Sequence, residues 1–282
     1  MRTLPFNQVD VFSAVPFKGN PLAVIAEADG LDEAQMRAIA NWTNLSETTF
    51  LSKPENPAAD YRVRIFTPHR ELPFAGHPTL GSCHVWLALG GQPKGEYVVQ
   101  ECGAGLVRIR RDGAKENPRL AFAAPPLRRS GEIEPGLKAK IAQALGVAES
   151  AIRAVQWVDN GPGWVGVLLG SRSELLNVSF NPAVLPNQPI GVVAPWDPAV
   201  DGDEAQFEVR GFMWSGGEDP VTGSLNASLA QWLIGAKIAP RQYVAAQGTV
   251  LGRAGRVHVA QQGDDIWIGG DVAACVSGTI NV

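Results

Sequence analysis

Two short segments of the sequence place ionisable residues beside glycine, proline and small hydroxyl residues. Residues 76–82 read Gly-His-Pro-Thr-Leu-Gly-Ser, and residues 218–224 read Glu-Asp-Pro-Val-Thr-Gly-Ser. Each lies between an alternating run typical of a strand and an apolar run typical of a helix. A loop of this kind presents backbone N–H groups at the positive end of a helix, where they attract anions. One such loop could be only a tight turn, but two matched copies favour a cradle for a small carboxylate.

The two segments belong to a longer internal repeat that spans residues 61–87 and 207–234. Aligned by sequence, Pro78 corresponds to Pro220, and His77 corresponds to Asp219. Ionisable residues at equivalent points of two loops favour a site over a purely structural repeat. We therefore expect Pro78 and Pro220 to superpose when one copy is rotated onto the other. The same alignment pairs Gly81 with Gly223 and Ser82 with Ser224.

The surrounding pattern predicts an α+β fold with two pseudo-symmetric lobes. Alternating residues predict strands, and apolar residues at helical spacing predict a helix in each copy, over 79–89 and 222–233. The pair Pro125-Pro126 and the polar stretch that follows mark a boundary, which gives lobes of residues 1–127 and 128–282. We expect the active site in the cleft between them. Outside the repeat, helices are expected over 32–42, with Asp32 at the N-cap and Ala34, Met36, Ile39 and Ala40 facing the core, and over 137–145, ending at Gly146.

The bulk composition excludes several classes of partner. The chain has 282 residues, of which 45% are hydrophobic, and its formal net charge is −4. Basic residues do not cluster, so nucleic acid and anionic membranes are poor partners. No run approaches 18 apolar residues, and the N-terminus lacks the apolar region of a signal peptide. Three scattered cysteines suit a reducing compartment, so a cytoplasmic protein is expected.

Glu47 lies in Ser46-Glu47-Thr48, between an expected helix and an expected strand. On its position alone, a glutamate there is more often a solvated edge charge than a catalytic group. Its importance comes from a resemblance. Together with Gly19-Asn20-Pro21, the segment 74–81 and the segment 218–224, this tripeptide resembles the motifs of the PhzF-like family, in the same order and over essentially the whole chain.

The resemblance implies the diaminopimelate-epimerase-like fold, in which each lobe is a curved, mostly antiparallel sheet wrapped around a central helix. It leaves open that the terminal strand crosses to the other lobe. The isomerase of phenazine biosynthesis that names the family acts on dihydro-hydroxyanthranilate without metal or cofactor, and a glutamate moves the proton. That residue falls on Glu47, and the assisting residues fall on His77, Asp219 and Ser224. Homodimers are usual in the family. The substrate-binding residues that we expect are Asn20, Gly76, Gly81, Gly223 and Ser224.

These expectations define an isomerase that moves a C–H proton within a small cyclic or unsaturated carboxylic acid, using Glu47 as general acid and base and no cofactor. One alternative is an epimerase of an amino or hydroxy acid, with Asp219 or His77 on the opposite face. Another is a small-acid-binding protein without turnover.

Two further enzyme classes are disfavoured by the residues. Related racemases use one cysteine at each loop, whereas both loops here lack cysteine, and Cys83, Cys102 and Cys275 suggest small buried residues. A metal hydrolase is the weakest interpretation, because the four histidines form no His-Glu-x-x-His motif. His77 and His84 could share a helix face only if His77 lay within the helix.

Overall fold

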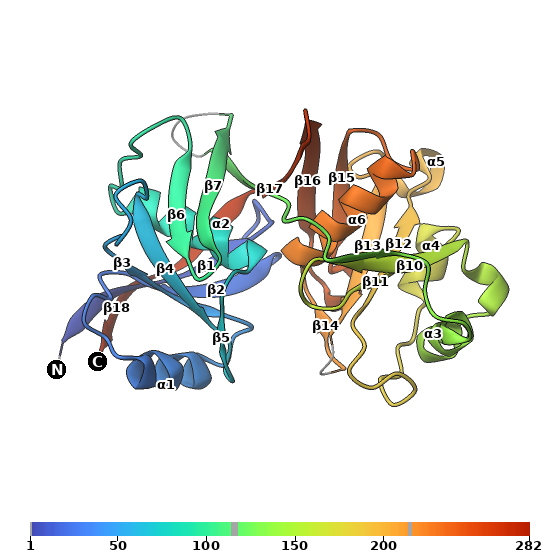
Figure 1. Cartoon of the computed structure of the whole chain (residues 1–282), viewed down its shortest axis with the longest axis horizontal. Coiled ribbons are helices and arrows are strands. Elements are labelled where there is room, and N and C mark those ends of the chain that lie inside the picture. Colours follow the sequence, from blue (N-terminus) through green and yellow to red (C-terminus); the bar gives the residue numbers. More distant parts are fainter. Residues whose placement is uncertain (1, 114–117, 214–215) are drawn as a thin grey trace. The chain divides into compact units, whose positions relative to one another are not determined.

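The computed structural model describes residues 2–113, 118–213 and 216–282 (Figure 1). The chain divides into two compact units. Unit 1 comprises Met1–Ala123 with Gly269–Val282, and unit 2 comprises Ala124–Ile268. The division after Ala123 differs from the expected boundary at residues 127 and 128. The last strand belongs to unit 1. The expected boundary placed it in the second lobe, although the family resemblance left open that it crosses to the other lobe.

Unit 1 is a mostly antiparallel arrangement of strands. The antiparallel neighbours are β18 with β1, β1 with β2, β3 with β4, and β6 with β7 and β7 with β8, whereas β2 with β3 and β4 with β6 are parallel. The strands are β1 (Thr3–Val11), β2 (Asn20–Ile25), β3 (Thr48–Ser52), β4 (Tyr61–Phe66), β5 (Glu71–Leu72), β6 (Val98–Cys102), β7 (Gly105–Asp112), β8 (Arg119–Ala123) and β18 (Val272–Asn281).

Unit 2 repeats this pairing scheme. Strand β11 runs parallel to β12, β12 pairs antiparallel with β13, and β13 runs parallel to β15. These neighbours correspond to β2, β3, β4 and β6 of unit 1. The strands are β9 (Arg129–Gly131), β10 (Ala154–Asp159), β11 (Val165–Leu168), β12 (Ile190–Pro195), β13 (Phe207–Phe212), β14 (Glu218–Asp219), β15 (Gln242–Gln247), β16 (Gly255–Gln262) and β17 (Asp265–Gly270), whose last two residues belong to unit 1.

Each unit contains one buried helix, α2 (Gly76–Ala88) in unit 1 and α6 (Gly223–Gly235) in unit 2. Both are apolar around most of their circumference, as expected of a helix enclosed by a sheet. Close packing requires glycine at Gly81, because a Cβ there would lie 2.5 Å from Leu22 Cδ2. The first turn of α2 tolerates Pro78, because an N-terminal turn leaves its N–H groups without intrahelical partners.

The expected superposition of Pro78 and Pro220 is wrong. Pro78 is the third residue of α2, whereas Pro220 precedes α6. The residue that matches Pro220 is Pro73, since each proline directly follows a two-residue strand, β5 or β14. With the helices aligned, His77 corresponds to Ser224, and Asp219 corresponds to a leucine at the end of β5.

Of the smaller helices, α1 and α3 lie where the sequence predicted them, whereas α4 and α5 were not predicted. Helix α1 has the N-cap Asp32, whose carboxylate accepts from the backbone N–H of Gln35 while the Gln35 side chain accepts from the Asp32 N–H. Met36 and Ala40 are buried as expected, but Ala34 is exposed. Within the described residues no helix is long and apolar enough to cross a membrane. The remaining helices are α1 (Glu33–Thr43), α3 (Leu137–Leu145), which ends at Gly146, α4 (Arg172–Leu176) and α5 (Pro198–Asp201).

Candidate active site

Glu47 lies in the short connection between α1 and β3. Helix α1 is followed by its C-cap Asn44, which adopts the left-handed conformation, and β3 begins at Thr48, in parallel register with Ala23. The hydroxyls of Thr43 and Thr48 are 2.7 Å apart and join the two ends of the connection. The Glu47 side chain is only 15% exposed. It is therefore not the solvated edge charge that its sequence position alone would suggest.

His77 lies in the first turn of α2 and faces Glu47. Its Nε2 is 3.3 Å from Glu47 Oε2, and its side chain is 7% exposed. The imidazole also forms a hydrogen bond to the Pro21 backbone, and because proline has no N–H, the carbonyl accepts this bond. Nε2 forms no hydrogen bond within the described part of the chain, so Nδ1–H is the donor. Burial lowers the pKa of His77 to about 3, which makes the ring neutral at neutral pH.

The geometry of this pair determines where a proton can lie. A neutral imidazole that donates through Nδ1 has a lone pair on Nε2, and an ionised carboxylate has only lone pairs. Two acceptors held 3.3 Å apart in a buried site repel each other unless one proton lies between them. If Glu47 takes up a proton, Nε2 of His77 is the acceptor that faces it.

The Gly19-Asn20-Pro21 segment supports this pair. The N–H of Gly19 donates to Asp10 Oδ2 at 2.8 Å, and a Cβ on Gly19 would collide with the Val11 carbonyl oxygen. Asn20 is fully buried and opens β2 opposite Val11. This fixed start of β2 holds the Pro21 carbonyl that orients His77. A direct contact of Asn20 with substrate remains a prediction.

In unit 2, Asp219 is tied to the start of α6. Its Oδ2 accepts the Thr222 hydroxyl at 2.7 Å. Thr222 is the N-cap residue of α6, and its backbone N–H donates to Gln247 Oε1 at 3.0 Å. Asp219 is the last residue of β14, in register with Gly211. Its carboxylate is therefore held beside the N-terminus of the buried helix.

Ser224 has two partners that sequence reasoning missed. Trp164 Nε1 donates to Ser224 Oγ at 3.1 Å, and Asn160 Nδ2 donates to the Ser224 carbonyl at 2.9 Å. Because an indole N–H can only donate, the serine oxygen is the acceptor, and its own hydrogen remains available for an acceptor such as a carboxylate. Asn160-Gly161-Pro162 reads as a turn after a strand, but nothing in the sequence connects it with Ser224.

The helix starts reduce the number of backbone donors available for an anion. In α2 the first backbone hydrogen bond of the helix runs from Thr79 N to Ala75 O, and in α6 it runs from Asn226 N to Thr222 O. The N–H groups of residues 76, 77 and 223–225 precede these bonds, whereas Pro78 has none. Gly76 and Gly223 are the first residues of their helices and are well placed as donors. The later N–H groups of the expected cradle, including that of Gly81, lie inside α2, and Gly81 has a packing role.

The expectations about cysteine and histidine chemistry have mixed outcomes. Cys83 and Cys102 are buried as expected, and burial raises the pKa of both thiols, whereas Cys275 is partly exposed. His77 does lie in the same helix as His84. Among the described residues, however, no group of three or more potential ligands could hold a metal ion.

Comparison with known proteins identifies relatives over nearly the whole chain. The family model described as "Phenazine biosynthesis-like protein" (PhzC-PhzF) matches residues 9–278. Antisense-enhancing sequence 1 of Schizosaccharomyces pombe is 36% identical over 292 residues, which cover 97% of each chain. The trans-2,3-dihydro-3-hydroxyanthranilate isomerase of Pseudomonas aeruginosa is 32% identical over 265 residues, covering 90% of this chain and 89% of that one. A crystal structure of a PhzF-family phenazine biosynthesis protein from Enterococcus faecalis covers all of both chains with a TM-score of 0.81 at 26% identity, which confirms the expected fold class.

Proposed function

The chain belongs to the PhzC-PhzF family of phenazine biosynthesis-like proteins, and from this premise we propose that it moves a C–H proton within a small cyclic or unsaturated carboxylic acid, without a cofactor. The family resemblance read from the sequence is confirmed. The general class, an isomerase, follows from relatives that carry that name, among them the Pseudomonas aeruginosa enzyme. The proton transfer and the substrate class are our proposal.

The observation that carries the proposal is the buried contact between Glu47 and His77, 3.3 Å from Oε2 to Nε2. A carboxyl group that removes a proton from carbon and returns it elsewhere must change its protonation state during each turnover. The Nε2 lone pair of the neutral His77 imidazole can accept from a protonated Glu47 carboxyl and thereby stabilise the state that has taken up the proton. The Pro21 carbonyl keeps the Nε2 lone pair directed at Glu47 by accepting from Nδ1.

The substrate class follows from the donors around the helix starts. Gly76 and Gly223 are the first residues of two helices, and the N-terminal N–H groups of these helices can bind a carboxylate. Ser224 adds a hydroxyl donor. We assign Asp219 to orienting the same substrate, because its carboxylate is held beside the start of α6. Negative charge that develops when carbon loses its proton would be stabilised by the same donors. Action in the cytoplasm and assembly as a homodimer stay predictions.

Exchange of carbon-bound hydrogen with solvent tests the proposal directly. Small cyclic and unsaturated carboxylic acids are incubated with the protein in deuterium oxide, and incorporation is read by mass spectrometry and NMR. A substrate should take up deuterium with the wild-type protein, and Glu47→Gln should reduce the rate at least about 10²-fold, the lower range of general acid–base effects. Affinity for the same acid should change little, because glutamine keeps the shape of the side chain.

Exchange at the wild-type rate in Glu47→Gln would remove Glu47 from the mechanism and leave Asp219 as the better candidate. Migration of the proton identifies an isomerase, whereas inversion at the exchanging carbon would identify the epimerase alternative.

A further inference from the structure

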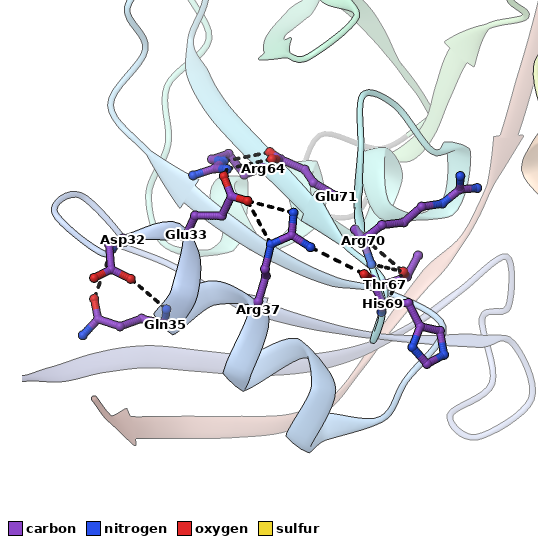
Figure 2. A network of polar contacts seen from close by, with 9 residues as sticks. All are labelled: Asp32, Glu33, Gln35, Arg37, Arg64, Thr67, His69, Arg70 and Glu71. Atoms are coloured by element: carbon purple, nitrogen blue, oxygen red, sulfur yellow. Dashed lines mark hydrogen bonds and ion pairs between the residues drawn. The ribbon is translucent and has the colours of Figure 1, made fainter.

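Unit 1 contains a bidentate ion pair between Arg64 on β4 and Glu71 on β5. Arg64 Nε donates to Glu71 Oε1 and Arg64 Nη2 donates to Glu71 Oε2, both at 2.7 Å. The guanidinium also lies over the ring of Phe66, 5.0 Å from its centroid. Figure 2 shows Arg64 between this carboxylate and that of Glu33 on α1, which Arg64 Nη2 contacts at 3.2 Å.

Unit 2 contains the same arrangement between Arg210 on β13 and Glu218 on β14. Arg210 Nε donates to Glu218 Oε1 at 2.9 Å, and Nη2 donates to Oε2 at 2.7 Å. Its guanidinium lies 4.9 Å from the centroid of the Phe212 ring. This pair is the more buried of the two, with side-chain exposures of 7% and 10%, against 25% for Arg64 and 32% for Glu71.

Both pairs anchor the same point of the repeated chain. Glu71 and Glu218 each open a two-residue strand, and a three-residue connection then leads to the first residue of α2 or α6. The prolines of the two connections pack alike. A Cβ on Gly103, which follows β6, would lie 2.9 Å from Pro73 Cα, and a Cβ on Gly248, which follows β15, would lie 2.6 Å from Pro220 O.

We propose that Arg64–Glu71 and Arg210–Glu218 are positioning clamps that set the first turns of α2 and α6. The first clamp acts on His77, and the second acts on Asp219, which directly follows Glu218. The roles of His77 and Asp219 rest on the proposed function, whereas the effect of the clamps on their positions does not. None of the four clamp residues is proposed to touch the substrate.

A clamp is needed because a two-residue strand forms too few hydrogen bonds with its neighbouring strand to fix its position. Strand β5 is in register with only Ile65 and Phe66 of β4. A fork of two parallel, charge-assisted hydrogen bonds fixes orientation as well as distance, which a single bond or a point charge does not. The Arg–Glu fork therefore determines where the connection to the helix begins.

The second clamp has an additional anchor on its arginine. Arg210 Nη1 donates to the backbone carbonyls of Leu175 at 3.2 Å and Val178 at 2.7 Å. The guanidinium is thus fixed independently of the glutamate. It gives β14 a rigid point of attachment, so a change at Glu218 should move Asp219 while Arg210 stays in place.

Glu71→Gln tests the first clamp, with Glu33→Gln as its matched control. Both remove a carboxylate that contacts the same guanidinium, but only Glu71 lies on β5 (Figure 2). The readout is the NMR signals of the His77 imidazole in ligand-free protein, because these signals require no substrate and report the ring's surroundings. We expect Glu71→Gln to shift the His77 signals and Glu33→Gln to leave them within the spread of wild-type preparations. Arg64→Lys keeps the charge but loses the fork, so it should shift them as Glu71→Gln does.

Three outcomes would overturn the clamp proposal. These are unchanged His77 signals in Glu71→Gln, equal shifts in Glu71→Gln and Glu33→Gln, or an Arg64→Lys variant that matches the wild type. Backbone amide spectra of each variant establish that it is folded, and if Glu71→Gln does not fold, Arg64→Lys provides the test. Failure of the proposed function would instead appear as undiminished deuterium exchange in Glu47→Gln, an outcome that has no bearing on the His77 spectra of the clamp variants.

Discussion

Burial of a neutral His77 should make the stability of the protein depend on pH in a defined window. The pKa of His77 is lowered from 6.5 to about 3, mainly by burial, with the Pro21 carbonyl acting in the opposite direction. In the unfolded chain the imidazole takes up a proton near pH 6.5, whereas in the folded protein it does so only near pH 3. Between these values the unfolded state binds more protons, so stability falls as the pH falls.

The magnitude follows from the size of the window. At about 1.36 kcal/mol per pKa unit, the whole displacement is worth about 5 kcal/mol, all of it lost by pH 3. Lowering the pH from 7 to 4.5 covers a little over half of the window. We therefore expect His77 to account for a decrease of about 2–3 kcal/mol in the free energy of unfolding over that range.

His77→Asn isolates this contribution. Asparagine can keep an N–H near the position of Nδ1 for the Pro21 carbonyl, but it does not titrate. Urea unfolding of both proteins at pH 7 and pH 4.5 gives the pH-dependent change for each, and their difference belongs to His77. NMR titration of the imidazole provides an independent value. Equal pH dependence in the two proteins, or a His77 that titrates near pH 6.5, would refute the neutral buried ring.

Two other predictions concern side chains that hold the site and the fold of unit 2. Trp164→Phe removes the indole N–H that donates to Ser224 Oγ, so affinity for a carboxylic acid ligand should fall about fivefold, equivalent to about 1 kcal/mol, as measured by calorimetry. Glu208 is fully buried and accepts from Arg172 Nε at 2.9 Å, so Glu208→Gln should lower the free energy of unfolding by about 3 kcal/mol. The exposed partner of another arginine, Glu204, is the control, and Glu204→Gln should change stability by less than about 1 kcal/mol. Similar losses in the two glutamate variants would contradict the importance of burial.

The ends of some helices could be predicted from the sequence, because residues at those ends determine where the helix begins or stops. The N-cap of α1 was predictable because Asp32 bonds to backbone three residues away, and the end of α3 was predictable because Gly146 adopts the left-handed conformation. The start of α2 was not. Proline reads as a helix breaker, so Pro78 suggested a loop, although the first helical turn accommodates it. The helix therefore begins three residues before the expected Thr79.

The site was only partly predictable, because its contacts join residues that are distant in sequence. The position of Glu47 in the sequence suggested a solvated charge, and only the family resemblance indicated a catalytic role. Its burial depends on how α1 and β3 are joined, and its pairing with His77 depends on where α2 begins. Trp164 and Asn160 lie about 60 residues before Ser224, and no local pattern links them. Contacts of this kind arise from the fold as a whole.

The corrected alignment of the two copies changes what the repeat implies for the chemistry. Aligned by sequence, His77 and Asp219 appeared as ionisable residues at equivalent points of the two loops. Aligned by structure, the equivalents are His77 and Ser224, each the second residue of its buried helix. The parts preserved in both copies are the Arg–Glu fork, the packed proline and the helix start, all of which hold backbone N–H groups in place. The residues suited to proton transfer, Glu47 with His77, have no acid–base counterpart among the described residues of unit 2. The repeat therefore supports anion binding by both copies, whereas the proton transfer that we propose rests on one copy only, as expected if a single glutamate both takes and returns the proton.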